Sequence, residues 1–247
     1  MAAQDANDTP LKPFDEDWTR ALAVVAHPDD LEFGATSAIA RWARQGKRIR
    51  ELLVTKGEAG IETVPPEEAG PLRVEEQRAA GRIVGAERVD FLDFSDGTLE
   101  YGLDLRRALA RSIREHRPEV VLSINFREHF PGQGSYNHAD HRVLGPALLD
   151  AVRDAANTWV FPELAEEGLK AWKGVRAVAF AASPRATHYT PFEEDDLKTG
   201  IASLDAHEVY MAALEGFDHK SMLRRSATEA GARNGVGFAV EFEVLDA

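Results

Sequence analysis

Short apolar runs alternate with stretches of helical spacing along most of the chain. Residues 21–26 form a nearly continuous apolar run, which is typical of a strand buried on both faces of a parallel sheet. Residues 31–45 then place apolar side chains at helical spacing, and Gly46 follows where a C-terminal cap is expected. Further strands are predicted at residues 49–55, 88–92, 120–124, 176–181 and 187–190, and further helices at residues 72–84, 103–116 and 195–214. Strands separated by helices predict an α/β fold with a mostly parallel sheet.

The last apolar pattern differs from the others because it alternates strictly. In residues 237–244, Phe238, Val240, Phe242 and Val244 fall on one face of the predicted strand. We expect a half-buried edge strand or an oligomer contact within a small C-terminal subregion.

The connections and the start of the chain complete the predicted organisation. Two long loops, residues 56–70 and 125–137, each follow a strand, so we expect them to lie over the carboxyl edge of the sheet. Residues 1–17 are polar and acidic, which predicts a flexible arm without the features of a signal peptide. Residues 18–247 show no internal repeat and no linker, and are expected to form a single domain.

Composition narrows the function classes. The formal net charge is −13, which argues against nucleic acid or an anionic membrane as the main partner. No apolar run approaches the roughly 20 residues of a membrane helix, so we expect a cytoplasmic protein. Because the chain has no cysteine, any metal must be held by histidines and carboxylates.

Two polar stretches carry the candidate chemistry. The first, Ala26-His27-Pro28-Asp29-Asp30, follows the strand at 21–26; the second, Asn137-His138-Ala139-Asp140-His141, opens a predicted helix. A bend at the proline allows the side chains three positions apart in the first stretch to reach one ion. The two histidines of the second stretch stand at i and i+3 and share a helical face. Three protein ligands with an open position are typical of catalytic zinc.

Simpler interpretations were weighed for the same residues. Asp29 and Asp30 are suited to cap a helix N-terminus, and His141 to a hydrogen-bonded place in the core. Dinucleotide binding is disfavoured, because the turn has carboxylates where backbone would have to approach a pyrophosphate.

The two stretches, taken in order, resemble the PIG-L (LmbE-like) family of zinc-dependent de-N-acetylases, and the resemblance covers about residues 21–210. It implies a Rossmann-like three-layer fold. It further implies that His27, Asp30 and His141 bind Zn²⁺, with iron, manganese or cobalt as possible substitutes. Asp29 would be the general base, and His138 would stabilise the oxyanion or protonate the leaving amine. Asp140 is expected to raise the pKa of His138 as its partner.

Two further residues take their expected roles from the resemblance alone. Arg73 matches an arginine that contacts the sugar, and Asp96 matches an aspartate that receives substrate hydroxyls. Their simpler interpretations are a solvated helix face and an ordinary turn residue. His188 and His207 are near the site in some relatives and are equally suited to structural roles.

The function implied by the resemblance is hydrolysis of the N-acetyl amide of an N-acetylglucosamine-type conjugate, such as the intermediates of mycothiol or bacillithiol synthesis. The alternatives are an enzyme resembling mycothiol S-conjugate amidase, and a non-catalytic zinc- or sugar-binding protein. The expected partner is a small amino-sugar substrate. The resemblance also implies a homo-oligomer, either a trimer or a hexamer.

Overall fold

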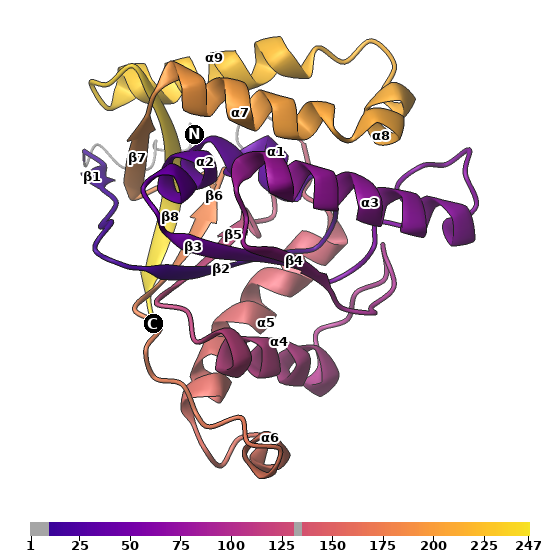
Figure 1. The fold of residues 1–247 in the computed structure, drawn as a ribbon, viewed down its shortest axis with the longest axis vertical. Helices are drawn as coiled ribbons and strands as arrows, with labels where there is room; N and C mark the ends of the chain where they lie inside the picture. Colours follow the sequence, from indigo (N-terminus) through magenta and orange to yellow (C-terminus); the bar gives the residue numbers. More distant parts are fainter. Residues whose placement is uncertain (1–9, 131–134) are drawn as a thin grey trace, which may run out of the picture.

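The computed structural model describes residues 10–130 and 135–247, which build an eight-stranded sheet with helices on both faces (Figure 1). The strands are β1 Lys12–Pro13, β2 Arg20–Val25, β3 Arg48–Leu53, β4 Arg88–Phe91, β5 Val120–Ile124, β6 Ala177–Ala181, β7 His188–Phe192 and β8 Phe238–Asp246. The helices are α1 Asp30–Gly34, α2 Thr36–Arg44, α3 Pro66–Val84, α4 Leu103–His116, α5 Ala139–Ala156, α6 Pro162–Glu166, α7 Glu194–Asp205, α8 Glu208–Ala213 and α9 His219–Arg233.

The sheet has the order β1-β7-β8-β6-β5-β2-β3-β4. Its pairs are parallel except those of β8, which runs antiparallel to both β6 and β7. The mostly parallel α/β sheet predicted from the sequence is therefore confirmed. No described helix is long and apolar enough to cross a membrane.

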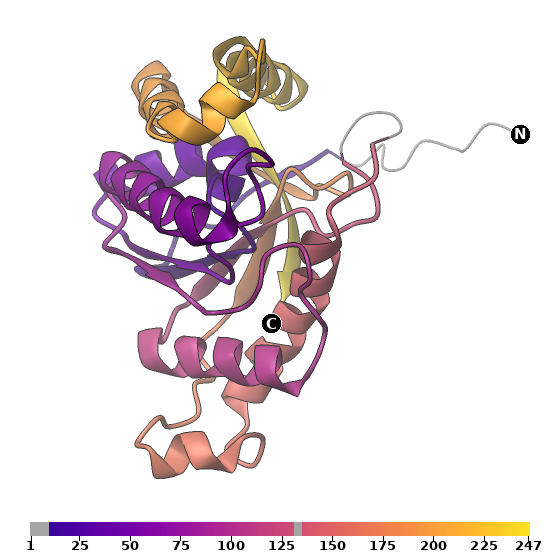
Figure 2. The same cartoon turned by 90° about the vertical axis from the view of Figure 1, so that its right-hand side faces the viewer.

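An apolar cluster lies on each face of the sheet, between the strands and the helices that cover them. Leu22 and Val24 of β2 pack into the cluster beneath α4 and α5, whereas Ala23 and Val25 of the same strand pack toward α1 and α2. Figure 2 shows α4 and α5 on one side of the sheet and α1–α3 on the other. Helices α7 and α9 lie outside α1–α3, farther from the sheet. Because β2 is covered on both faces, its sequence is apolar at every position after the first.

The site is positioned by the neighbouring strands β2 and β5. From β2 the chain proceeds to β3 and β4 on one side, and from β5 it proceeds to β6 on the other side. The helices that follow these strands, α1–α2 and α5, cover opposite faces of the sheet. A crevice therefore opens at the carboxyl ends of β2 and β5, where ligands bind in open α/β sheets.

Three predicted helices have different limits in the structure. The helix expected at 31–45 is divided into α1 and α2 at Ala35, whose φ is −135°. The helix expected at 195–214 is likewise divided into α7 and α8, with Ala206 and His207 between them. Helix α3 begins at Pro66, where a proline fits the first turn, so the preceding loop is shorter than predicted.

The C-terminal strand was expected to be an edge strand or an oligomer contact. The edge position is wrong, because β8 is inserted between β6 and β7. Its alternation arises because one face packs into the core through Phe242, while the other includes Glu243, which is buried in a hydrogen bond from Ser183 and an ion pair with Arg127. Helix α9, which covers β8, was not predicted; its buried positions are only alanine and glycine.

The N-terminal segment also departs from the expected arm. Residues 1–9 lie outside the described residues. Lys12 and Pro13, within the expected arm, form β1 and pair with β7, and Phe14 is buried against Trp42 and Phe242.

Candidate functional site

A cavity of about 650 Å³ opens at the carboxyl ends of β2 and β5. Its polar lining comes from both sequence stretches and from three other segments: His27, Asp29, Asp30, Arg73, Asp96, Asn125, His138, Asp140 and His141. Its apolar lining includes Phe33, Ile124, Phe130, Ala182, Tyr210 and Met222. The cavity therefore brings together every residue that the sequence analysis assigned to the site.

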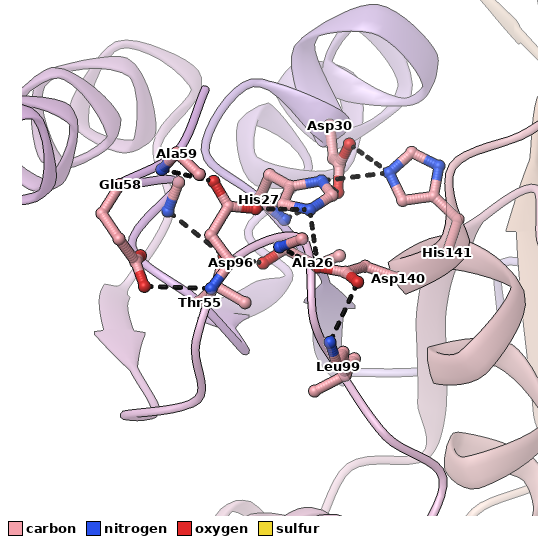
Figure 3. A network of polar contacts seen from close by, with 12 residues as sticks. Ala26, His27, Asp30, Thr55, Glu58, Ala59, Asp96, Leu99, Asp140 and His141 are labelled. Carbon is pink, nitrogen blue, oxygen red and sulfur yellow. Dashed lines mark hydrogen bonds and ion pairs between the residues drawn. The ribbon is translucent and has the colours of Figure 1, made fainter. Parts of the chain in front are cut away.

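Three side chains direct their donor atoms toward one point (Figure 3). His27 Nδ1 lies 3.2 Å from His141 Nε2, and His141 Nε2 lies 2.9 Å from Asp30 Oδ1. His27 Nδ1 lies 3.6 Å from Asp30 Oδ2, which also accepts the backbone N–H of His27 at 2.8 Å. Ligand atoms around a tetrahedral ion with bonds of about 2.0–2.1 Å are about 3.3 Å apart, so the spacing suits zinc.

The ring of His27 is oriented by two carboxylates. Its Nε2 lies 3.2 Å from Asp140 Oδ2 and 3.1 Å from Asp96 Oδ1. Asp140 is itself held by the backbone N–H groups of Gly97 at 2.8 Å and Leu99 at 3.1 Å. Ionised carboxylates only accept hydrogen bonds, so the proton of the neutral ring belongs on Nε2. The lone pair of Nδ1 is then free for a metal.

Asn137 orients the ring of His141 in the same way. The Asn137 amide nitrogen donates to the carbonyls of Asn125 at 2.8 Å and Arg127 at 2.9 Å, which fixes the direction of the amide. Its Oδ1 accepts the backbone N–H of His138 at 2.8 Å and faces His141 Nδ1 at 2.9 Å. The His141 proton is thereby assigned to Nδ1, and Nε2 presents a lone pair to the same point as His27.

These donors fit a bound Zn²⁺. Two imidazole nitrogens with free lone pairs would face each other unfavourably without a proton or a cation between them. A second group, His27 with Asp96 and Asp140, also has metal-like spacing. That group uses His27 Nε2, whose proton is already shared with the two carboxylates through a hydrogen bond to Asp140 and an ion-pair contact with Asp96. His27, Asp30 and His141 are therefore the group whose free lone pairs could hold a metal ion.

Asp29 lies beside this group in an unusual backbone conformation. Its φ is 88°, in the left-handed region that non-glycine residues rarely adopt. It stands before α1 at the N-cap position, yet its side chain makes no capping hydrogen bond. Instead Asp29 Oδ2 accepts a hydrogen bond from Arg73 Nη2 at 3.1 Å. Burial raises the pKa of the Asp29 carboxyl to about 7, and the Arg73 guanidinium opposes that rise.

His138 also lines the cavity, with its ring centre 5.0 Å from that of His141 and 5.6 Å from that of Phe130. Burial, followed by the nearby His141 and His27, lowers the pKa of His138. Asp140 acts in the expected upward direction, but the net shift is opposite to our expectation. The reason is that the Asp140 carboxylate faces His27 and two backbone N–H groups.

The two residues expected to bind substrate both line the cavity with largely buried side chains. Arg73 is 2% exposed, and its guanidinium also donates to the carbonyls of Pro28 at 2.6 Å and Gly57 at 2.9 Å. These contacts give Arg73 a direct role in holding the turn at Asp29. Asp96 lines the cavity, and its Oδ2 accepts the backbone N–H of Ala59 at 2.9 Å.

His188 and His207, the two other histidines named from the sequence, lie apart from the candidate metal position. His188 is on β7, near Thr187 and Phe14, and does not line the cavity. His207 is completely buried, with Nε2 3.9 Å from Glu32 Oε2.

The sequence alone did not indicate the contacts of two residues near the site. Asn137 belongs to the second polar stretch but had no expected role, and Gln77, whose Oε1 accepts the backbone N–H of Asp29 at 2.9 Å, had none either. Gln77 follows Arg73 by four residues, a spacing that places both on one face of α3, and this was the available clue.

Comparisons with known proteins relate this chain to one family of de-N-acetylases. The profile of the family described as PIG-L: GlcNAc-PI de-N-acetylase matches residues 22–152. A diacetylchitobiose deacetylase from Thermococcus kodakarensis is 28% identical over 200 residues, which cover 80% of this chain and 60% of that protein's length. The match thus spans less than two thirds of that relative.

Two more proteins extend the comparison. A 1D-myo-inositol 2-acetamido-2-deoxy-alpha-D-glucopyranoside deacetylase 2 from Saccharopolyspora erythraea is 27% identical over 228 residues, covering 80% of this chain and 77% of that protein. The solved structure of N,N'-diacetylchitobiose deacetylase from Pyrococcus horikoshii, in complex with an inhibitor, superposes with a TM-score of 0.83 at 20% identity, covering 93% of this chain and 85% of the other. At this identity the structural likeness establishes the fold.

Proposed function

Because the chain belongs to the PIG-L family, we propose that it hydrolyses the N-acetyl amide of an N-acetylglucosamine-type conjugate in a zinc-dependent reaction. The products are acetate and a free amine. The relatives named above support this reaction class, since they are deacetylases of acetylated amino sugars by name.

One observation carries the proposal. His27 Nδ1 and His141 Nε2 face each other across 3.2 Å, and a separate acceptor fixes the proton of each ring on the nitrogen that points away. A carboxylate that is not part of this group, Asp29, lies beside it at the cavity wall. A binding protein would have no use for such a carboxylate, whereas amide hydrolysis needs a base for the attacking water.

When bound by His27, Asp30 and His141, Zn²⁺ acidifies water and polarises the acetyl carbonyl. Asp29 takes the proton of the attacking water. Its Oδ2 is held by Arg73, so we assign the transferred proton to Oδ1. We assign to His138, which also lines the cavity, stabilisation of the developing oxyanion or protonation of the leaving nitrogen.

The cavity suits a conjugate better than a bare acetyl group. A volume of about 650 Å³ falls in the range of pockets that enclose drug-sized ligands. The carboxylate of Asp96 lines the cavity and would accept hydrogen bonds from sugar hydroxyls, while Phe33, Phe130 and Met222 offer apolar surface to the rest of the conjugate. We assign Asp96 to substrate binding, and Arg73 to both the cavity wall and the support of Asp29.

The test is acetate release from a panel of N-acetylglucosamine conjugates by the zinc-loaded protein, the chelated protein and the protein reloaded with zinc. Activity that is lost on chelation and regained with Zn²⁺ supports the proposal. Cleavage of a different amide of the conjugate, without acetate release, would indicate an enzyme resembling the conjugate amidase. Binding of conjugates without turnover would indicate a binding protein, and turnover after complete metal removal would exclude zinc dependence.

We also propose that residues 18–247 act as one domain together with β1 and Phe14, which pack into it, and that the protein assembles as a homotrimer or homohexamer. The family resemblance supports this assembly. Light scattering of the purified chain tests it, and a monomeric mass at micromolar concentration would contradict it.

A further inference from the structure

Two buried side chains of α3 contact the turn that carries Asp29. Arg73 and Gln77 lie one helical turn apart and are 2% and 1% exposed. Arg73 Nη2 donates to Pro28 O at 2.6 Å and to Asp29 Oδ2 at 3.1 Å. Gln77 Oε1 accepts the backbone N–H of Asp29 at 2.9 Å. One helix thus holds the backbone and the carboxylate of the same residue.

The backbone of Asp29 requires such support. Its φ of 88° is unfavourable for a residue with a Cβ atom and persists only where the surroundings hold it. The N–H group at this position is buried, so it needs an acceptor. Gln77 supplies that acceptor. A side chain without one would leave the N–H unpaired and would release the turn to relax.

The orientation of the Gln77 amide is itself fixed by two buried carboxyl groups. Gln77 Nε2 donates to Glu51 Oε2 at 3.1 Å and to Glu32 Oε1 at 3.3 Å. If the amide flipped, its NH₂ would face the N–H of Asp29 and its oxygen would face both carboxyl groups. Glu51 and Glu32 are at most 1% exposed, so water does not replace these contacts.

The next turn of α3 makes room for this arrangement. Gly81 follows Gln77 by four residues, and a Cβ atom there would lie 3.1 Å from Glu51 Oε2 and 2.5 Å from a methyl carbon of Val89. Glycine therefore allows α3 to approach β3 and β4 closely enough for Gln77 to reach both Glu51 and the turn. Arg73, Gln77 and Gly81 form one continuous face of the helix.

We propose that Gln77 is a positioning residue for Asp29: it fixes the left-handed turn through the Asp29 N–H, and Glu32 and Glu51 hold its amide in the required direction. The inference rests on the proposed function, because Asp29 matters as a base only if the protein hydrolyses an amide. A merely space-filling glutamine would affect stability and leave turnover per folded, zinc-loaded molecule unchanged.

The experiment measures kcat, KM, zinc content and melting temperature for the zinc-loaded wild type and four variants. Gln77→Met keeps the length of the side chain and removes both hydrogen-bonding functions. Gln77→Glu keeps the acceptor and removes the donor, which places a third carboxylate in the buried cluster. The double variant Glu51→Gln with Gln77→Glu exchanges the two side chains, so that an amide at position 51 donates to a carboxylate at position 77. Arg78→Met, on the exposed side of the same helix, is the matched control.

We expect Gln77→Met to lower kcat about 10- to 100-fold, the effect of a slightly misplaced catalytic group, with KM and zinc content nearly unchanged. Gln77→Glu should also lower kcat, and the double variant should recover most of it. Arg78→Met should behave as wild type.

Wild-type turnover in Gln77→Met would overturn the inference, and so would a loss of zinc. If Gln77→Met does not fold, the single and double Gln77→Glu variants decide: no recovery in a folded, zinc-loaded double variant would overturn it. A wild type that releases no acetate from any conjugate would instead refute the proposed function, and the inference with it.

Discussion

Glu51 should make the stability of the protein decrease with rising pH. It lies on β3, is completely buried, and accepts a hydrogen bond from Gln77. Burial, with a further contribution from Glu32, raises the pKa of the Glu51 carboxyl from 4.5 to about 8. Between these values the folded state keeps a proton that the unfolded state releases. The contribution of Glu51 to the free energy of unfolding therefore falls as pH rises from about 4.5 to about 8.

The size of the effect follows from the shift. Each pKa unit corresponds to about 1.4 kcal/mol, so a rise from 4.5 to about 8 limits the loss to about 5 kcal/mol. Glu51→Gln removes the titrating group and keeps a side chain that can accept from Gln77. The variant should therefore gain stability relative to wild type, by several kcal/mol at most, as pH rises from 5 to 8.

The assay is denaturant unfolding of the zinc-loaded wild type and Glu51→Gln at pH 5, 6, 7 and 8. The pH dependence of zinc binding affects both proteins alike, so their difference isolates Glu51. Glu75→Gln, an exposed position on α3, is the control and should show a difference that does not change with pH. A flat difference for Glu51→Gln, or one that favours the wild type as pH rises, would refute the reasoning.

Three further outcomes test the site. His141→Ala should lower both zinc stoichiometry, measured by mass spectrometry of the metal, and acetate release; full zinc retention would contradict its role as a ligand. Asn137→Ala should weaken zinc binding about 10- to 100-fold in a chelator competition, because His141 loses the acceptor that fixes its proton. Asp29→Asn should keep zinc and lose about 10²- to 10⁴-fold in rate, the usual contribution of a general base, and a near-normal rate would place the base elsewhere.

Local sequence patterns were sufficient to predict the strands that position the site. The apolar run before His27 required a strand buried on both faces, and β2 has that position in the sheet. The two polar stretches could be placed at the ends of strands because the end of each apolar run is visible in the sequence. Their meeting then follows from the shared carboxyl edge of a parallel sheet.

Long-range packing explains what the sequence did not reveal. The alternation in β8 indicates one apolar face, and an edge strand and an inserted antiparallel strand both satisfy it. The buried Glu243 on the other face has its ion-pair partner, Arg127, more than 100 residues away. In the sequence alone Gln77 is likewise an ordinary polar position on a helix, and its contact with Asp29 forms only when α3 packs against the turn.

The roles of the two polar stretches depend on each other more than their separate motifs suggest. His27 belongs to the stretch after β2, yet the carboxylate that sets its tautomer, Asp140, belongs to the stretch after β5. Asp140 therefore acts on the ring of a proposed metal ligand, where we had expected it to act on His138. The ring of His141 is set within its own stretch by Asn137, whose amide is fixed by the loop carbonyls of Asn125 and Arg127. Because β2 and β5 are neighbours, both lone pairs reach the same point only after the strands have paired, so the donor set is a product of the fold.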